Sequence, residues 1–371
     1  MNALRVLHII PSLEQGGAES LLASLVQETS DRIDNRVLTL TASNNFFGLD
    51  PRLIVENQLP HGKLNPAIIR QLRTAVKELE PDVVHAWMYH ANLCSSICLW
   101  GRAPLVWSVH NSTLPVETAK RATRLVNSIC ARISRFSPSR IIYVAEFVRE
   151  MHEAQGYDRS KGIVIPNGID LKRFDFSHFP PRPAGAGIQR PIVVGAIGRY
   201  SPEKGAHFLV DVIATHPMRN HIELVFVGRD FGNAPALSDH LRRVGLLGQT
   251  RLLEAVRDIE RIYASLDVFV LPSFSEAMPL TVLEAMAMKV PVCASRVGGI
   301  DQLQLAPEFL FPPKDAAACS RALSAAFAEV IASQDKFDLR DVIVRNFDIQ
   351  LTAQRYLALY QSLAPKSDDR K

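Results

Sequence analysis

The chain has 371 residues, of which 47% are hydrophobic and 22% charged, with a formal net charge of +4. This composition excludes wholesale disorder, and the length exceeds what one hydrophobic core ordinarily serves, so we expect two domains. The net charge is too small to indicate a nucleic-acid partner, and we expect none.

The N-terminal segment begins with a short apolar run that ends at Pro11 without a small-residue cleavage site, so we do not expect a signal peptide. No stretch approaches 18 uninterrupted apolar residues, so we expect no transmembrane helix. The five cysteines lack nearby metal ligands and are typical of small core residues in a reducing compartment. We therefore expect a cytoplasmic protein whose contact with the inner face of the cytoplasmic membrane, if it makes one, is peripheral.

Short apolar, β-branched runs alternate with amphipathic helical patterns along the first half of the chain. Such an alternation predicts an α/β fold with a parallel sheet. The expected strands are residues 5–10, 36–41, 81–87, 104–110, 140–145 and 161–167.

A stretch rich in proline and glycine, residues 176–191, then interrupts the pattern, and we place a linker at 179–190. The same alternation restarts beyond it, with runs within 191–197, 221–230, 266–273 and 290–295. Open parallel sheets bind ligands outside the carboxyl ends of their strands, so two such halves favour a nucleotide-like ligand held between them.

The sequence SEAMPLTVLEAMA, residues 275–287, places Glu276 and Glu284 eight positions apart around a proline. Pro279 suits the first position of a helix, and Met278 would then be its N-cap. Methionine cannot accept a hydrogen bond, so amides of the first turn, which begins with Pro279 and Leu280, would be free to bind an anion. The alternative is that Glu276 complements the helix dipole and Glu284 lies on a solvated helix face.

Several motifs occur in an order that resembles the retaining GT-B glycosyltransferases of family 4, also described as glycosyl transferases group 1. The acids of residues 275–287 match that family's E-x7-E pattern. The other matching segments are GGAE (16–19), WSVHN (107–111), PNGID (166–170), GRYSPEKG (198–205) and LFPPKD (310–315).

The resemblance implies two Rossmann-like α/β domains facing across a cleft that holds a nucleotide sugar. It places the N-terminal domain, residues 1–178, on the acceptor side and the C-terminal domain, residues 191–348, on the donor side. Residues 349–371 would form a helix and tail that pack back toward the N-terminal domain.

The resemblance also implies roles for single residues. Glu284 would accept hydrogen bonds from the ribose hydroxyls, and Glu276 would contact the transferred sugar. Met278, Pro279 and Leu280 would supply the helix start that holds the donor.

Arg199 and Lys204 would clamp the diphosphate and stabilise the charge that develops as it leaves. We expect their partner to be this phosphate charge rather than a protein acid; the alternative is an exposed surface pair. Gly16 and Gly17 would let the first βα loop approach the ligand closely, or they form only a tight turn. His110 would lie near the reacting sugar, with a purely structural histidine as the alternative, whereas His85 and His90 would shape the cleft.

The function implied is a hexosyltransferase that retains anomeric configuration and requires neither metal nor cofactor. Its donor would be a nucleotide sugar, with UDP as the favoured nucleotide, and its acceptor a saccharide or lipid-linked saccharide in bacterial-type polysaccharide synthesis. Three positions depart from the family's pattern, Ala277, Lys289 and Gln302, and the first adds a methyl group beside the sugar.

Other functions remain open. A nicotinamide dehydrogenase is disfavoured because no G-x-G-x-x-G follows either first strand. A phosphorylase or a sugar-nucleotide 2-epimerase could share the architecture, and so could a non-catalytic sugar-nucleotide-binding subunit.

Residues 119–140 contain six basic residues and no acid. Leu125, Ile129, Ile133 and Phe136 recur there at helical spacing. A basic amphipathic helix can lie on an anionic membrane surface. The alternative is that its apolar face packs on the sheet while the arginines are solvated.

Overall fold

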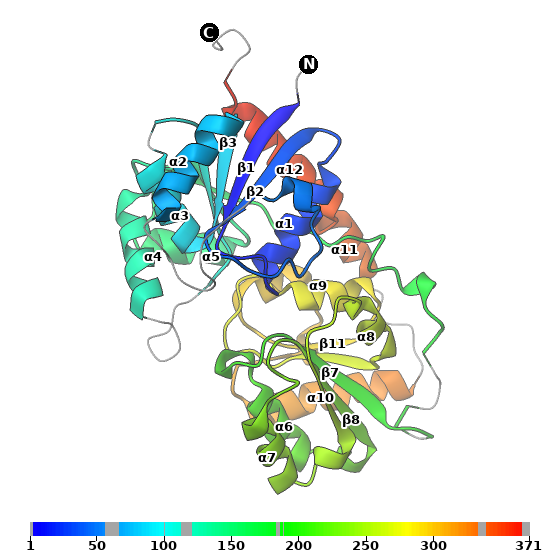
Figure 1. The fold of residues 1–371 in the computed structure, drawn as a ribbon. Helices are drawn as coiled ribbons and strands as arrows, with labels where there is room; N and C mark the ends of the chain where they lie inside the picture. The colour runs from blue at the N-terminus through cyan, green and yellow to red at the C-terminus, as the bar shows by residue number, and fades with distance from the viewer. Residues whose placement is uncertain are drawn as a thin grey trace. The chain divides into compact units, whose positions relative to one another are not determined.

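The computed structural model describes residues 3–55, 67–99, 101–112, 121–182, 186–187, 189–332 and 339–365 (Figure 1). The chain divides into two compact units: residues 1–168 with 349–371, and residues 169–348. Each unit contains one six-stranded sheet in which every pairing is parallel. The α/β fold class with two Rossmann-like halves is therefore confirmed.

The first unit has the strand order β2-β1-β3-β4-β5-β6. Its strands are β1 (Leu4–Ile10), β2 (Ile33–Thr39), β3 (Val83–Trp87), β4 (Leu105–Val109), β5 (Arg140–Tyr143) and β6 (Gly162–Val164). Its α-helices are α1 (Gly17–Glu28), α2 (Ala67–Leu79), α3 (Met88–Cys98), α4 (Arg121–Ile133), α5 (Glu146–Ala154) and α12 (Ile349–Leu363). The central strands β3 and β4 are buried at every position, because helices cover both faces of the sheet.

The helix α12 completes the core of the first unit, although it follows the whole second unit in sequence. It packs against α1, and Tyr356 and Tyr360 lie in the same hydrophobic cluster as the strands β1 and β3 (Figure 1). The Thr352 hydroxyl donates a hydrogen bond of 3.1 Å to the carbonyl oxygen of Pro166. Residues 169–178, which the sequence analysis placed in the N-terminal domain, belong to the second compact unit.

The second unit has the strand order β12-β11-β10-β7-β8-β9. Its strands are β7 (Ile192–Ile197), β8 (Ile222–Val227), β9 (Thr250–Leu253), β10 (Val268–Leu271), β11 (Val292–Ser295) and β12 (Leu310–Phe311). Its α-helices are α6 (Ala206–Thr215), α7 (Pro235–Arg243), α8 (Ile259–Ser265), α9 (Leu280–Ala287), α10 (Ala316–Ile331) and α11 (Arg340–Asn346). The sequence analysis missed β9 and β12, which are the two short edge strands of the sheet.

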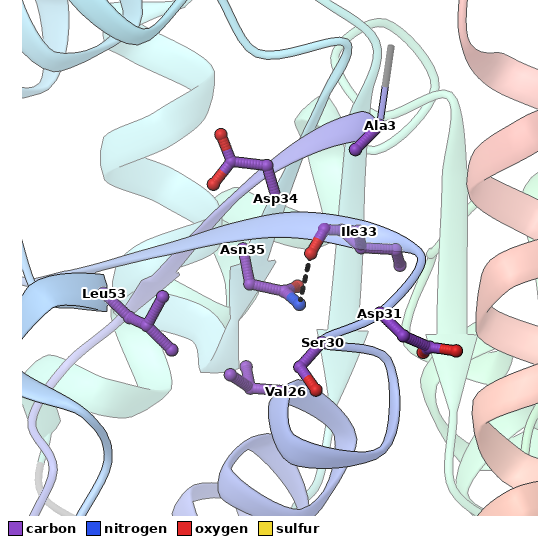
Figure 2. Close-up of a pocket in the computed structure, with 8 residues that line it drawn as sticks. All are labelled: Ala3, Val26, Ser30, Asp31, Ile33, Asp34, Asn35 and Leu53. Atoms are coloured by element: carbon purple, nitrogen blue, oxygen red, sulfur yellow. Dashed lines mark hydrogen bonds between the residues drawn. The ribbon is translucent and has the colours of Figure 1, made fainter. Parts of the chain in front are cut away.

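A cavity of about 270 Å³ lies in the first unit beside the amino ends of β1 and β2 (Figure 2). Figure 2 shows Asn35 on its wall, with the side-chain amide donating to the carbonyl oxygen of Ile33. Ligands of parallel sheets bind at the opposite, carboxyl ends of the strands, so this cavity does not coincide with the predicted site.

Candidate functional site

Two segments that follow neighbouring strands bring candidate site residues together in the second unit. Residues 198–205 follow β7, and residues 272–279 follow β10, which pairs with β7 in the sheet. Gly205 has φ +70°, and a Cβ atom at this position would lie 2.1 Å from the carbonyl oxygen of Pro272. Only glycine permits this contact. The two segments therefore pack directly on each other at the carboxyl edge of the sheet.

The cations carried by the first segment form ion pairs with protein acids. Lys204 Nζ lies 2.7 Å from Oε1 of Glu276, whose side chain is 9% exposed. Arg199 Nη2 lies 2.9 Å from Oε1 of Glu203, which also accepts a hydrogen bond from the Ser201 hydroxyl. The expectation that neither cation has a protein acid as its partner was therefore wrong. Opposite charges brought this close attract each other strongly when they are shielded from solvent.

The helix α9 begins one residue later than predicted. Leu280 is its first residue, and Pro279, with ψ 104°, is the N-cap in place of Met278. The Pro279 carbonyl accepts a hydrogen bond of 3.1 Å from the amide of Val282. No side chain caps the helix, so the inference that amides of its first turn lack a side-chain acceptor survives the shift.

The backbone around Glu276 is held by a glycine pair that the sequence analysis did not assign to the site. Gly298 has φ +61°, and a Cβ atom there would lie 2.2 Å from the carbonyl oxygen of Glu276. The amide of Gly299 donates a hydrogen bond of 2.8 Å to the carbonyl oxygen of Ala277. These contacts fix the segment that carries the first acid of the motif.

Glu284 lies in the second turn of α9 and is only partly exposed. Its Oε2 accepts a hydrogen bond of 2.7 Å from the hydroxyl of Tyr263, a fully buried residue of α8. Burial raises the pKa of the Glu284 carboxyl, whereas the Tyr263 hydrogen bond and the Arg173 guanidinium oppose this rise. The alternative of a fully solvated helix face is therefore wrong for Glu284.

In the first unit, His110 follows β4, with its ring stacked on Trp87 at a centroid distance of 5.2 Å. Its Nε2 lies 3.1 Å from the hydroxyl oxygen of Ser108. Burial lowers the pKa of His110 to about 3, so at neutral pH its imidazole is uncharged. It can donate or accept a hydrogen bond there but cannot supply a positive charge.

Gly16 is the N-cap of α1, and Gly17 is the first residue of that helix. The φ of Gly16 is −172°, which any residue can adopt, and a Cβ atom there would meet only the movable carboxylate of Glu19. The close approach of a ligand to this loop stays a prediction.

Three further histidines have separate positions. His85 lies in the core of the first unit, where its Nδ1 is 2.7 Å from the Tyr360 hydroxyl. His8 Nδ1 accepts a hydrogen bond from Trp87 Nε1, and His8 Nε2 lies 3.0 Å from Asn35 Oδ1. His90 lies on α3 and is partly exposed. Among the described residues, no group of three or more His, Cys, Asp or Glu could hold a metal ion.

Comparison with known families matches most of the chain in two parts. The description "Glycosyltransferase Family 4" matches residues 15–173, and "Glycosyl transferases group 1" matches residues 191–329. The chain belongs to glycosyltransferase family 4.

Known relatives agree with this family. TuaC of Bacillus subtilis, assigned as a teichuronic acid biosynthesis glycosyltransferase, is 27% identical over 83% of this chain and 77% of its own. The lipopolysaccharide core biosynthesis mannosyltransferase LpsB of Rhizobium meliloti is 32% identical over 54% of this chain and 60% of its own. Among solved structures, HepE of Anabaena in complex with UDP-glucose has a TM-score of 0.80 at 23% identity, covering 97% of this chain and all of HepE. At that identity the likeness shows the fold alone, which is GT-B.

Proposed function

We propose that this chain is a retaining, metal-independent hexosyltransferase that moves a sugar from a UDP-linked donor to a saccharide or lipid-linked saccharide acceptor. The observation that supports it most is the 2.7 Å pair between Lys204 and Glu276, which lies close in sequence to the uncapped start of α9. A cation, a carboxylate and helix amides that no side chain caps are groups suited to binding a sugar diphosphate.

In the proposed reaction, the donor's diphosphate takes over the cations from their protein partners. Arg199 leaves Glu203 and contacts phosphate oxygens with its planar fork, and Lys204 leaves Glu276 as a point charge. Both interactions strengthen as negative charge develops on the departing diphosphate, so they lower the barrier to bond breaking.

Release of Lys204 also frees the Glu276 carboxylate to contact the transferred sugar. That carboxylate stabilises the positive charge that develops on the sugar ring, and it orients the ring. Retention follows if a leaving phosphate oxygen accepts the acceptor's proton on the same face, and Glu276 then acts electrostatically rather than as a nucleophile. His110, neutral in its buried setting, would donate a hydrogen bond to the reacting sugar.

The choice of donor and acceptor rests on the relatives. HepE was solved with UDP, with UDP and glucose, and with UDP-glucose, which supports a UDP-linked donor here. TuaC and LpsB carry names from teichuronic acid and lipopolysaccharide synthesis, which supports a polysaccharide or lipid-linked acceptor.

Kinetics of two variants test this assignment. We expect Glu284→Gln mainly to raise the donor KM, because ribose contacts change little as the bond breaks. We expect Glu276→Gln mainly to lower kcat, because contacts with the charged sugar strengthen in the transition state. Turnover of UDP-glucose and analysis of its products give both constants, with melting temperatures as the folding control.

Variants that both turn over like the parent would refute the assignment. Free sugar phosphate or an epimerised nucleotide sugar as the product would instead establish the phosphorylase or the 2-epimerase. Binding of UDP-glucose without turnover against every acceptor would favour the non-catalytic subunit.

We also propose that α4 rests on an anionic membrane surface. The buried face of this helix consists of Asn127, Cys130 and Ala131. Leu125 on this helix and Phe136, three residues beyond its end, are instead 63% and 64% exposed, so packing on the sheet does not account for them. The Arg135 guanidinium lies over the Phe136 ring at 5.4 Å, which places charge and apolar surface together.

Part of the predicted segment, residues 119 and 120, lies outside the described residues. Its basic residues that the structure describes are Arg121, Arg124, Arg132, Arg135 and Arg140. In the described part of the chain, no helix has the length and apolar content that crossing a bilayer requires. A surface helix of this kind gains about 1 kcal/mol of binding per basic residue near anionic lipid.

Sedimentation with phosphatidylglycerol vesicles tests the membrane proposal. We expect the triple change of Arg121, Arg132 and Arg135 to Gln to weaken binding by about a hundredfold, because three charges leave the surface. The matched control changes Arg242, Arg261 and Arg345 to Gln, three arginines of the second unit whose side chains are also exposed. Equal binding by both triple variants would refute the proposal.

A further inference from the structure

The hydroxyl of Tyr263 is shared between two acceptors in the second unit. It lies 2.7 Å from Oε2 of Glu284 and 3.0 Å from the carbonyl oxygen of Thr281. Tyr263 is fully buried, and its ring contacts Phe174 and Phe269 at centroid distances of 6.2 and 5.8 Å. These aromatic neighbours fix the ring, so the position of the hydroxyl is set by packing.

The Tyr263 hydroxyl has one proton, so it can donate to only one of its two acceptors at a time. Burial, with the nearby Glu284 carboxylate, raises the pKa of Tyr263 well above its ordinary value, so the hydroxyl keeps its single proton at neutral pH. A carboxylate is the stronger acceptor and here also the nearer one. Tyr263 therefore donates to Glu284 Oε2, and its oxygen remains beside the first turn of α9.

The other carboxyl oxygen of Glu284, Oε1, has no hydrogen-bond partner among the described residues. Two charged groups act on this carboxyl from a distance: Arg173 favours the ionised form and Glu260 disfavours it. These two groups are paired with each other at 3.1 Å, and their effects on the carboxyl oppose one another, with that of Arg173 the larger. In the described part of the chain, the hydrogen bond from Tyr263 is the strongest influence that favours the charged form of this partly buried acid.

We propose that Tyr263 is the positioning residue of the nucleotide site. By holding Oε2, it keeps Glu284 ionised and leaves Oε1 for the ribose hydroxyls of the donor. This inference rests on the proposed role of Glu284 in binding ribose. Tyr263 itself touches no substrate, so its effect on binding passes entirely through the Glu284 carboxylate.

The consequence is a defined change in pH dependence. The Tyr263 hydrogen bond favours the ionised carboxyl and so lowers its pKa. Without the hydroxyl, the pKa of Glu284 rises further, and the carboxyl is protonated at a higher pH than in the parent. Nucleotide affinity, which needs the charged acceptor, should then decline at a higher pH as the solution is acidified.

The experiment measures UDP binding by calorimetry between about pH 5.5 and 8.5, so that affinity is followed as the solution is acidified from the alkaline side. It compares the parent, Tyr263→Phe, Glu284→Gln and the double variant. Tyr143→Phe is the matched control, because this buried tyrosine of the first unit has a hydroxyl with no hydrogen-bond partner among the described residues. Melting temperatures show whether each variant is folded.

We expect Tyr263→Phe to weaken UDP binding by about ten- to a hundredfold at neutral pH, the effect of losing one hydrogen bond to a charged group. The loss should shrink toward the alkaline end, where Glu284 is ionised even without the hydroxyl. Glu284→Gln should bind weakly with little pH dependence, and the double variant should match it, because Tyr263 acts through Glu284. Tyr143→Phe should bind as the parent does.

Each remaining outcome is decisive. If Glu284→Gln binds UDP like the parent, the ribose role of Glu284 is wrong and this inference fails with it. If Glu284→Gln is weakened but Tyr263→Phe shows the parent's affinity and pH profile, the inference fails alone. If the loss of UDP affinity in the double variant equals the sum of the two single losses, Tyr263 does not act through Glu284, and the inference fails.

Discussion

At the scale of single residues, both cations of the candidate site are paired with protein acids. Glu276 is nearly buried beside Lys204, whereas Arg199, 49% exposed, pairs with Glu203 near solvent. Removing one partner of a buried pair leaves an uncompensated charge, but exposed pairs contribute little.

We expect Lys204→Met to reduce the unfolding free energy by about 1–3 kcal/mol, because Glu276 loses its partner. Arg199→Met should cost less than about 1 kcal/mol. Adding Glu276→Gln to Lys204→Met should recover part of the loss, since no unpaired carboxylate remains. Urea unfolding followed by circular dichroism measures all three. Equal losses for the two single variants would contradict this difference in burial.

The motif residues could be predicted from sequence, but their partners could not. Glu276 and Glu284 are recognisable by their spacing within one short stretch. Lys204 and Glu276 are 72 positions apart, and Tyr263 lies on a different helix from Glu284, so no local pattern encodes either contact. The wrong expectation about the cations has this cause: a spacing motif carries no information about distant neighbours.

At the scale of elements, buried polar side chains of β1, β2 and β3 are linked by hydrogen bonds within an otherwise apolar sheet. His8 on β1 accepts from Trp87 on β3, and its second ring nitrogen contacts Asn35 on β2. Burial lowers the pKa of His8 from 6.5 to about 4, although the Asn35 contact favours the charged form. The folded state therefore binds a proton on His8 less readily than the unfolded state does.

This difference predicts acid sensitivity of the first unit. The folded pKa lies below the unfolded one, so the stabilisation is complete above about pH 6.5 and is lost as the pH falls toward about 4. The full effect for His8 is about 3 kcal/mol, at about 1.4 kcal/mol per pH unit. Between about pH 6.5 and 4, the unfolding free energy of the parent should decline as the pH falls. We expect His8→Gln to make this decline shallower by about 1.4 kcal/mol per pH unit.

The fluorescence of Trp87 and Trp107 reports unfolding of the first unit, since both are buried in its sheet. Urea titrations at several pH values give the slope. His221→Gln, an exposed histidine of the second unit, is the control and should leave the slope unchanged. A His8→Gln slope equal to the parent's would show that this imidazole is not responsible.

Strands were predicted correctly from sequence where both of their faces are covered by the protein. Strands covered on both faces are continuous apolar runs, which is why β3, β4 and β10 were found. The edge strand β9 is as long as β10 but has no buried position, and β12 has only two residues, so neither forms a continuous buried apolar run. For α4 the helical spacing was correct as far as Ile133, where the helix ends, so Phe136 lies beyond it. Periodicity alone could not decide whether Leu125 and Phe136 would be covered.

At the scale of the whole molecule, each unit has its own hydrophobic core and its own parallel sheet. Repetition of one strand–helix pattern on either side of a proline-rich stretch was enough to predict two such halves. The exact grouping of residues 169–178 was not predictable, because it depends on packing within the second unit: the Arg340 guanidinium donates to the carbonyl oxygens of Leu171 and Phe174.

The position of α12 has a consequence for the order in which the chain folds during synthesis. The ribosome releases residues 169–348 before it releases Ile349, Tyr356 and Tyr360, which belong to the core of the first unit. The second unit is one continuous segment and can fold as soon as it emerges. The first unit, although made first, must wait with part of its apolar surface uncovered until α12 arrives, so its folding is completed last.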